Sequence, residues 1–358
     1  MDTAMALCGL VAVLNLVGLV MVLSSSSVES IRQYGSPWHY FGRDLMWMAV
    51  GTGVFTLAIK VDYHRWRRWA TGAVVAAGVG LAAVLVPHVG VSVSGASRWL
   101  GTSFIQFQPS EFAKVALILF IADLLDRRGD GARWRPRLGP VLIVLTVLVL
   151  LVMKQPDMGT SMVLVVIALG MLFAAGAPMR PLCGVLGVGA AGGLLMAVAA
   201  PYRWARVTSF LHPMKDATNT GYQAVQGLIS MGSGGLLGTG LGKSIASWGY
   251  LPNQQTDFIF AVIAQETGLL GSMVVVALFA ALVFLGVRVA CRAPDRFGGL
   301  LAAGITAWLG SQVIINIGAV VGLLPVTGVP LPFVSYGGSS LVFSLFGVGV
   351  LANVARSR

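Results

Sequence analysis

The sequence predicts an all-α polytopic membrane protein that forms one domain over residues 1–358. Hydrophobic residues make up 56% of the chain and charged residues only 10%, against roughly 25% charged residues in soluble domains. About ten apolar segments approach the roughly 20 residues that a bilayer-spanning helix needs. The net charge is +11, but the basic residues lie in short clusters between apolar segments. That placement is typical of membrane-flanking residues and does not indicate a nucleic-acid partner.

The expected spans follow one another along most of the chain. We place them at residues 4–23, 45–61, 70–90, 110–125, 138–153, 160–176, 181–200, 257–287, 299–323 and 337–354. No basic residue precedes Arg32, so the first segment is interpreted as a span and not as a cleavable signal. The eighth is long for one crossing. We expect its first part, up to Gly268, to lie at the membrane interface or to dip into the membrane.

The basic clusters predict the orientation of the chain. They lie between spans two and three, between four and five, between eight and nine, and at the C-terminus. With ten spans all of these positions fall on one side, which is therefore expected to be cytoplasmic. Both termini would lie on that side. The longest outer loop, about 201–256, would then connect spans seven and eight.

Asp257 stands where this outer loop meets the apolar segment of span eight. Water can reach a carboxylate at such a junction, while the dry surroundings favour its protonated form. Both conditions suit a general base that acts on a lipid-linked substrate. The alternative is that Asp257 caps the N-terminus of a helix, where the dipole stabilises a negative charge. Position alone leaves both interpretations open.

Charged residues near the outer end of span four form a second group of candidates. Glu111 and Lys114 are three residues apart and share one helix face. They form either a structural ion pair or a charged lining of an outward cavity. Arg98, on the preceding loop, is a candidate phosphate clamp because its guanidinium is forked. Its alternative is snorkelling beside Trp99.

Further candidates lie at the outer ends of later spans. Asp157 follows Pro156 and is expected to cap the next helix or to join the cavity of Asp257. Arg203 and Arg206 belong to a basic and aromatic stretch that fits the lipid headgroup region. Lys243 ends a glycine-rich stretch that approaches a Walker loop, yet lies on the outer face, where there is no ATP. Those glycines instead allow tight turns and close approach to a substrate.

The last constellation surrounds the loop before span ten. Gln312 and Asn316 lie one helical turn apart, and we expect them to hydrogen-bond a neighbouring helix. The following residues 324–340 contain three prolines and three glycines, which predicts a shaped, non-helical segment that lines a cavity or is buried in protein. We expect Ser335 and Ser339 in this segment to contact the substrate. No protein metal site is expected, because the three cysteines are far apart.

The chain contains four motifs, in the order Gln108-Pro-Ser-Glu-Phe-Ala-Lys, Gln155-Pro-Asp-Met-Gly-Thr, Thr256-Asp-Phe-Ile-Phe-Ala and Pro332-Phe-Val-Ser-Tyr-Gly-Gly-Ser-Ser. Together they resemble the SEDS family (shape, elongation, division, sporulation), typified by FtsW, RodA and SpoVE. The resemblance covers about residues 24–340, nearly the whole chain. Residues around 222–223 and 242–252 resemble the FtsW-like division branch more than the RodA branch.

This chain departs from the family pattern just before Asp257. The family commonly has Leu-Pro-Glu-x-His-Thr-Asp, whereas here Asn253 and Gln255 replace the glutamate and the histidine. Any help that those two residues give to catalysis in relatives is missing here. The family also often pairs two glutamates after this motif, and here Gln265 precedes Glu266. Asp257 itself is present.

The resemblance implies a peptidoglycan glycosyltransferase in the bacterial cytoplasmic membrane that joins lipid II units at the outer face. A class B penicillin-binding protein would perform the cross-linking, and other divisome or elongasome membrane proteins would be partners. Asp257 would act as the base. The pyrophosphate leaving group would be held by a divalent cation such as Mg²⁺ or Mn²⁺, or by basic side chains; the candidates are Arg98, Lys114, Arg203, Arg206 and Lys243.

Two other functions stay open at this point. A lipid II flippase would need a continuous polar path across the membrane, whereas the polar candidates cluster on the expected outer face of the protein. A non-catalytic scaffold for a penicillin-binding protein is the other possibility, since the family's Glu and His are absent.

Overall fold

The computed structural model describes residues 3–87, 89–93, 96–101, 106–127, 135–198, 204, 208–210, 214 and 221–357. Each expected span overlaps one long helix, in the same order along the chain. The helices are α1 (Thr3–Tyr34), α2 (His39–Lys60), α4 (Ala70–Val84), α5 (Pro109–Arg127), α6 (Arg135–Lys154), α7 (Met158–Ala174), α8 (Met179–Val198), α11 (Ile259–Cys291), α12 (Arg296–Val320) and α13 (Gly338–Arg356).

The membrane class of the chain is confirmed. Helices α1, α11, α12 and α13 are long and apolar enough to cross a bilayer, and α4, α6 and α7 contain shorter apolar stretches. The protein is therefore a mostly helical, multi-pass membrane protein. The number of crossings stays a prediction, because length and composition alone do not place a bilayer.

Shorter elements fill the connections. They are α3 (His64–Arg67), α10 (Tyr222–Ser233), the 3₁₀ helix η2 (Ile245–Trp248), and the strands β1 (Gly90–Val93), β2 (Ala96–Gly101) and β3 (Gln106–Phe107). The strands form an antiparallel sheet in the order β1-β2-β3, with Gly90 opposite Leu100 and Leu100 opposite Phe107. The segment between α4 and α5 was expected to be a loop, and that expectation is wrong. Its β-branched valines favour strands.

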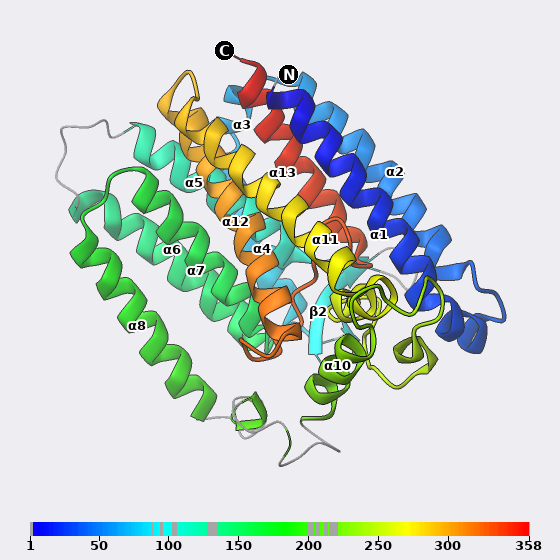
Figure 1. The fold of residues 1–358 in the computed structure, drawn as a ribbon. Coiled ribbons are helices and arrows are strands. Elements are labelled where there is room, and N and C mark those ends of the chain that lie inside the picture. The colour runs from blue at the N-terminus through cyan, green and yellow to red at the C-terminus, as the bar shows by residue number, and fades with distance from the viewer. Residues whose placement is uncertain are drawn as a thin grey trace.

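The two ends of the molecule carry different elements (Figure 1). The N- and C-termini lie at one end, together with α3 and the turn between α11 and α12. The sheet and α10 lie at the opposite end. Both termini therefore share one side, as the basic clusters predicted. The end that carries the sheet and α10 corresponds to the expected outer face.

Close helix packing holds α2 against α13 and depends on small residues. A Cβ on Gly349 would come within 2.8 Å of the Phe55 backbone oxygen, and one on Gly338 within 2.3 Å of the Trp47 ring. Small residues let helices approach closely where water provides no driving force. At the centre of the bundle, the side chain of Trp308 on α12 is fully buried.

Helix α11 is kinked at Gly268, where the first part of the long eighth span was expected to end. Gly268 has φ 70° and ψ −167°, a combination that only glycine adopts readily. The glycine-rich segment 234–242 packs into this kink, with the Thr239 amide donating to the Gln265 carbonyl at 3.0 Å. A Cβ on Gly268 would lie 2.4 Å from the Gly238 nitrogen. The glycines thus serve backbone contact with α11.

Candidate active site

Asp257 lies in the turn that precedes α11, not at the cap of the helix. The N-cap position is Phe258, which makes no side-chain capping bond, and α11 begins at Ile259. The capping interpretation of Asp257 is therefore wrong. The side chain is partly exposed, and its Oδ1 accepts a hydrogen bond from Thr256 Oγ1 at 3.0 Å. A partly exposed carboxylate at this junction is available to a substrate.

The backbone around Asp257 is held by a buried amide on α12. Asn316 Nδ2 donates to the Asp257 carbonyl at 2.9 Å and to the Val329 carbonyl at 2.8 Å. One side chain thus ties the Asp257 turn to the segment before α13. The expectation that Asn316 bonds a neighbouring helix is wrong, because its partners are loop carbonyls. Gln312, one turn away, is also buried, and neither of its amide atoms has a partner among the described residues.

Ser335 provides a second connection between the same two segments. Its hydroxyl donates to the Thr256 carbonyl and accepts from the Leu331 amide at 2.9 Å. The Tyr336 amide donates to the Gln255 carbonyl at 2.9 Å. These bonds fix the residues immediately before Asp257. Ser335 therefore lies next to the candidate base, with its hydroxyl engaged by the backbone, and its contact with substrate stays a prediction.

Gly328 lies beside the carboxylate of Asp257. It has φ 75°, and a Cβ built there would be 3.9 Å from Asp257 Oδ2. The neighbouring residues Thr327 and Val329 pack on Gly159 of α7, where an added Cβ would come within 2.3 Å of a Val329 methyl group. The 327–329 segment thus lies next to both Asp257 and the start of α7.

The expected ion pair is buried on α5, behind the start of α7. Lys114 Nζ lies 2.7 Å from Glu111 Oε1, and both side chains are at most 2% exposed. Lys114 Nζ also lies 5.0 Å from the centre of the Trp308 ring, a distance suited to a cation–π contact. Glu111 Oε2 has no partner among the described residues. The pair is a structural element of the helix bundle, and Glu111 Oε2 can still accept a hydrogen bond.

Arg98 and Asp157 lie together at the turn between α6 and α7. Arg98 donates from Nε to the Gln155 carbonyl at 3.1 Å and from Nη2 to the Pro156 carbonyl at 2.6 Å. Asp157 caps α7 by accepting from the Thr160 amide at 3.0 Å. Its charge acts on Lys114. The structure thus assembles four of the predicted residues into one cluster: Arg98, Glu111, Lys114 and Asp157, called the α6–α7 cluster below.

The remaining candidates lie elsewhere. Ser339 joins the start of α13 to β3, accepting from the Gln108 amide at 3.2 Å and donating to the Gln106 carbonyl at 3.0 Å. Lys243 is exposed on the segment that packs at the α11 kink. Arg203 and Arg206 lie outside the described residues. No three His, Cys, Asp or Glu side chains cluster as metal ligands in the described part of the chain, and the divalent cation stays a prediction.

The residues that depart from the family pattern have structural partners. Asn253 has φ 54°, a conformation that asparagine tolerates better than most residues, and its carbonyl accepts from the Thr256 amide at 3.1 Å. Glu266 accepts from Ser24 Oγ at 2.6 and 2.7 Å. Gln265 donates to Ser233 Oγ at 2.9 Å. Glutamine and glutamate therefore hold the glycine-rich segment and α1 against α11.

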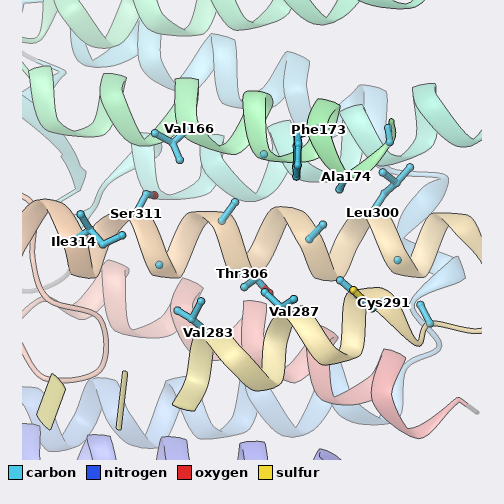
Figure 2. A pocket seen from close by; sticks show the side chains of 18 of the residues that line it. Val166, Phe173, Ala174, Val283, Val287, Cys291, Leu300, Thr306, Ser311 and Ile314 are labelled. Atoms are coloured by element: carbon cyan, nitrogen blue, oxygen red, sulfur yellow. The ribbon is translucent and has the colours of Figure 1, made fainter. Parts of the chain in front are cut away.

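A separate, apolar groove of about 1200 Å³ runs between α7, α11 and α12. Figure 2 shows Val166 and Phe173 on one side, Val283 and Val287 on the other, and Leu300 and Ile314 along α12. Asp295 and Arg296 line one end, and Leu324 the other. Thr306 and Ser311 are the polar side chains between these ends. A groove of this chemistry accommodates apolar chains. The carboxylate at its end, Asp295, is the N-cap of α12 and accepts from the Gly298 amide.

The sequence did not predict the roles of two residues at the site, Asn316 and Gly328. Asn316 was noted only as a helix-packing amide, and Gly328 was not singled out. A polar residue inside an apolar span is a usable signal, since such residues are costly in a membrane. Nothing in the local sequence indicates that Gly328 lies beside Asp257.

Comparison with known proteins agrees with this architecture. The sequence pattern of the FtsW/RodA/SpoVE family, described as cell cycle proteins, matches residues 5–358. The chain is 40% identical over 341 residues to stage V sporulation protein E of Bacillus subtilis, covering 95% of this chain and 93% of that protein. It is 38% identical over 339 residues to a probable peptidoglycan glycosyltransferase FtsW of Geobacter metallireducens, covering 94% and 90%.

A solved structure has a fold similar to that of this chain. The fold matches a chain from a study of how a peptidoglycan synthase complex coordinates polymerization and crosslinking, with a TM-score of 0.81, 29% identity and coverage of 99% of this chain and 97% of that chain. The names FtsW and stage V sporulation protein E among the curated relatives also agree with the predicted FtsW-like branch. The chain therefore belongs to the FtsW/RodA/SpoVE family of cell cycle proteins.

Proposed function

We propose that this chain is a peptidoglycan glycosyltransferase that polymerises lipid II at the outer face of the bacterial cytoplasmic membrane, with Asp257 as general base. The observation that carries the proposal is the setting of Asp257. Its carboxylate is partly exposed, while Asn316 and Ser335 hold the backbone on either side of it. The relative named a probable peptidoglycan glycosyltransferase FtsW supports the activity.

The reaction requires one proton acceptor. Asp257 takes the proton from the acceptor hydroxyl of the GlcNAc sugar as that oxygen attacks the anomeric carbon of MurNAc on the growing strand. The new carbon–oxygen bond forms while the bond to undecaprenyl pyrophosphate breaks, and the configuration inverts. Pyrophosphate leaves readily, so a single carboxylate is sufficient. The fixed backbone keeps the base in place, which matters because misplacing a catalytic group by about 1 Å can cost about 100-fold in rate.

The pyrophosphate needs positive charge close to Asp257. Arg98 lies in the α6–α7 cluster, and two of its nitrogens are bound to carbonyls. Lys114 is buried and paired with Glu111, so its ammonium group is enclosed by protein. The exposed Lys243, the outer-loop residues Arg203 and Arg206, or a divalent cation would make the direct contact.

The proposed orientation rests on the basic clusters of the sequence, and the proposed partner on a similar protein of known structure. Both termini lie at the end opposite the sheet and α10. We assign that end to the cytoplasm because the basic clusters of the sequence are expected on the same side. The site then faces outward, where lipid II is used. The similar chain in a peptidoglycan synthase complex supports a class B penicillin-binding protein as partner. Other divisome or elongasome membrane proteins stay predictions.

Polymerisation of labelled lipid II by the purified protein with its partner tests this function. Asp257→Ala and Asp257→Asn are expected to abolish glycan strands in the presence or absence of Mg²⁺ or Mn²⁺, while both proteins keep the wild-type melting temperature. Asp62→Asn is a matched control, because Asp62 is exposed and lies beyond the other end of α2. Wild-type polymerisation by the Asp257→Asn protein would reject the assignment. Transfer of lipid II across liposomes without polymerisation would favour a flippase.

A further inference from the structure

Large apolar side chains are exposed on the glycine-rich segment that connects α10 to α11. We call residues 234–250 the outer rim, and in Figure 1 they lie beside the outer end of α11. Six side chains of the rim are 56–79% exposed: Leu236, Leu237, Leu241, Ile245, Trp248 and Tyr250. Lys243 is the only charged residue between positions 222 and 256. Single exposed apolar residues are ordinary, whereas a concentration of this kind marks an interaction surface.

The rim is packed on α11 through its glycines. A Cβ on Gly234 would lie 2.1 Å from the Ala264 carbonyl oxygen, and one on Gly238 would lie 2.1 Å from the Glu266 carbonyl oxygen. Because the backbone is held this closely, the two leucines between these glycines have no room to turn toward α11. Their exposure is therefore a fixed property of the fold.

The rim also replaces the hydrogen bonds that the kink in α11 breaks. In a regular helix, the amides of residues 269–270 donate to the carbonyls of residues 265–266. At the kink, four bonds with the rim take their place: the Leu269 amide to the Gly235 carbonyl at 3.0 Å, Leu270 to Leu236 at 3.2 Å, Thr239 to Gln265 at 3.0 Å and Gly240 to Glu266 at 3.0 Å. Backbone groups without partners are costly near acyl chains, and these bonds satisfy the kink and the rim together.

The length of α11 places its kink at the outer boundary of the membrane. Gly268 precedes Arg288 by twenty residues, which is a rise of about 30 Å along the helix. The hydrocarbon core is about 30 Å thick, and Arg288 belongs to the basic cluster expected at its cytoplasmic boundary. A tilted helix rises less, so Gly268 lies at the outer boundary of the core or just inside it.

The lipid-facing surface of α11 continues onto the rim. Four residues directly after the kink are 52–60% exposed: Leu269, Leu270, Met273 and Val274. Helix α11 is long and apolar enough to cross a bilayer, so these side chains face acyl chains. The bond from the Leu270 amide to the Leu236 carbonyl joins the two surfaces. The leucines of the rim therefore extend the same apolar face.

We propose that the outer rim is a lipid-binding surface, which inserts Leu236 and Leu237 among the acyl chains of the outer leaflet. Lys243, Trp248 and Tyr250 lie at the level of the headgroups. A lysine keeps its ammonium group in water while its stem covers apolar surface, and Trp and Tyr collect at membrane–water interfaces. The segment that leads to the candidate base is thereby anchored in the membrane surface instead of projecting into water.

Depth-dependent fluorescence quenching of the full-length protein in nanodiscs tests the rim. The fluorophore NBD is attached to Leu237→Cys after the three native cysteines are replaced with alanine, and each nanodisc holds one protein. Phosphatidylcholine with a nitroxide on its acyl chain is expected to quench Leu237→Cys as strongly as Met273→Cys on α11, while aqueous iodide quenches neither. Gln33→Cys, exposed at the outer end of α1, is the control and is expected to show the reverse.

A label at Lys243→Cys tests the level of the headgroups. A nitroxide close to the headgroup is expected to quench this label more than a nitroxide near the end of the acyl chain, because the rim lies at the boundary of the core. The opposite order would place Lys243 inside the core and overturn the assignment.

The other outcomes are equally distinct. Iodide quenching of Leu237→Cys as strong as that of Gln33→Cys would place the rim in water and overturn the inference. Quenching by the lipid nitroxide is expected to stay unchanged when a class B penicillin-binding protein is added, and its loss in that complex would make the rim a protein interface instead. If Leu237→Cys does not fold, Leu241→Cys decides. These readouts need no substrate, so they are independent of whether the protein polymerises lipid II.

Discussion

Asn316 is the residue whose replacement tests the architecture of the site most directly. Its side chain is 2% exposed and donates two hydrogen bonds, one to the Asp257 carbonyl and one to the Val329 carbonyl. Asn316→Leu keeps a similar volume and removes both bonds. Each buried carbonyl left without a donor costs about 1–3 kcal/mol, so the local penalty is roughly 2–6 kcal/mol.

The expected response to that penalty is detachment of the turn and loss of activity. Leaving the two carbonyls to find water moves Asp257 relative to the 327–329 segment. A displacement of about 1 Å corresponds to about a 100-fold loss of kcat. The measurement is the initial rate of glycan strand formation from lipid II at saturating substrate, together with the melting temperature in detergent.

Gln312→Leu is the matched control for this experiment. Gln312 lies one turn earlier on α12 and is 1% exposed, but its amide atoms have no partner among the described residues. Replacing an unpaired buried amide with an apolar group is expected to be neutral or stabilising. A wild-type rate in Asn316→Leu, or an equal loss of rate in Gln312→Leu, would refute the reasoning that the bridging amide positions the base.

Two further predictions concern the framework around the site. Gly268→Ala should lower the melting temperature, because the residue has φ 70° and its Cβ would lie 2.4 Å from the Gly238 nitrogen, whereas Gly9→Ala, with open space around it, should not; equal melting temperatures would contradict this. Glu111→Leu and Lys114→Met should each destabilise the protein by about 3–5 kcal/mol in chemical denaturation, because each leaves a buried charge unpaired. The double variant should regain most of that stability, and additive losses would show that the two charges are not coupled.

Local sequence properties predicted the helices and the position of Asp257 well. Hydropathy and length mark the apolar segments, and all ten expected ranges overlap a helix. The short sheet between α4 and α5 was missed, because strands of two to six residues are too short to show a clear period. The sequence did not show whether Asp257 is a helix cap or a general base. The two roles depend on whether α11 begins directly after Asp257 or one residue later, and sequence patterns do not locate a helix start that closely.

The assembly of the site could not be predicted in the same way. Arg98 and Lys114 were selected in one group and Asp157 in another. Their meeting at the α6–α7 turn depends on how β2, α5 and α7 pack. Asp44 appears in sequence as one charge at the start of an apolar helix, and only the tertiary structure shows that it is 6% exposed.

The sequence by itself determined the membrane class, the helices, the family motifs and the acidic residue in the turn before α11, because hydropathy, periodicity and motif spacing are properties of neighbouring residues. Only the tertiary structure showed which residues hydrogen-bond the backbone around Asp257 and which residues lie beside it. The bonds from Asn316 and Ser335 join residues 59 and 79 positions apart. Such contacts depend on the packing of whole helices, which no local pattern specifies.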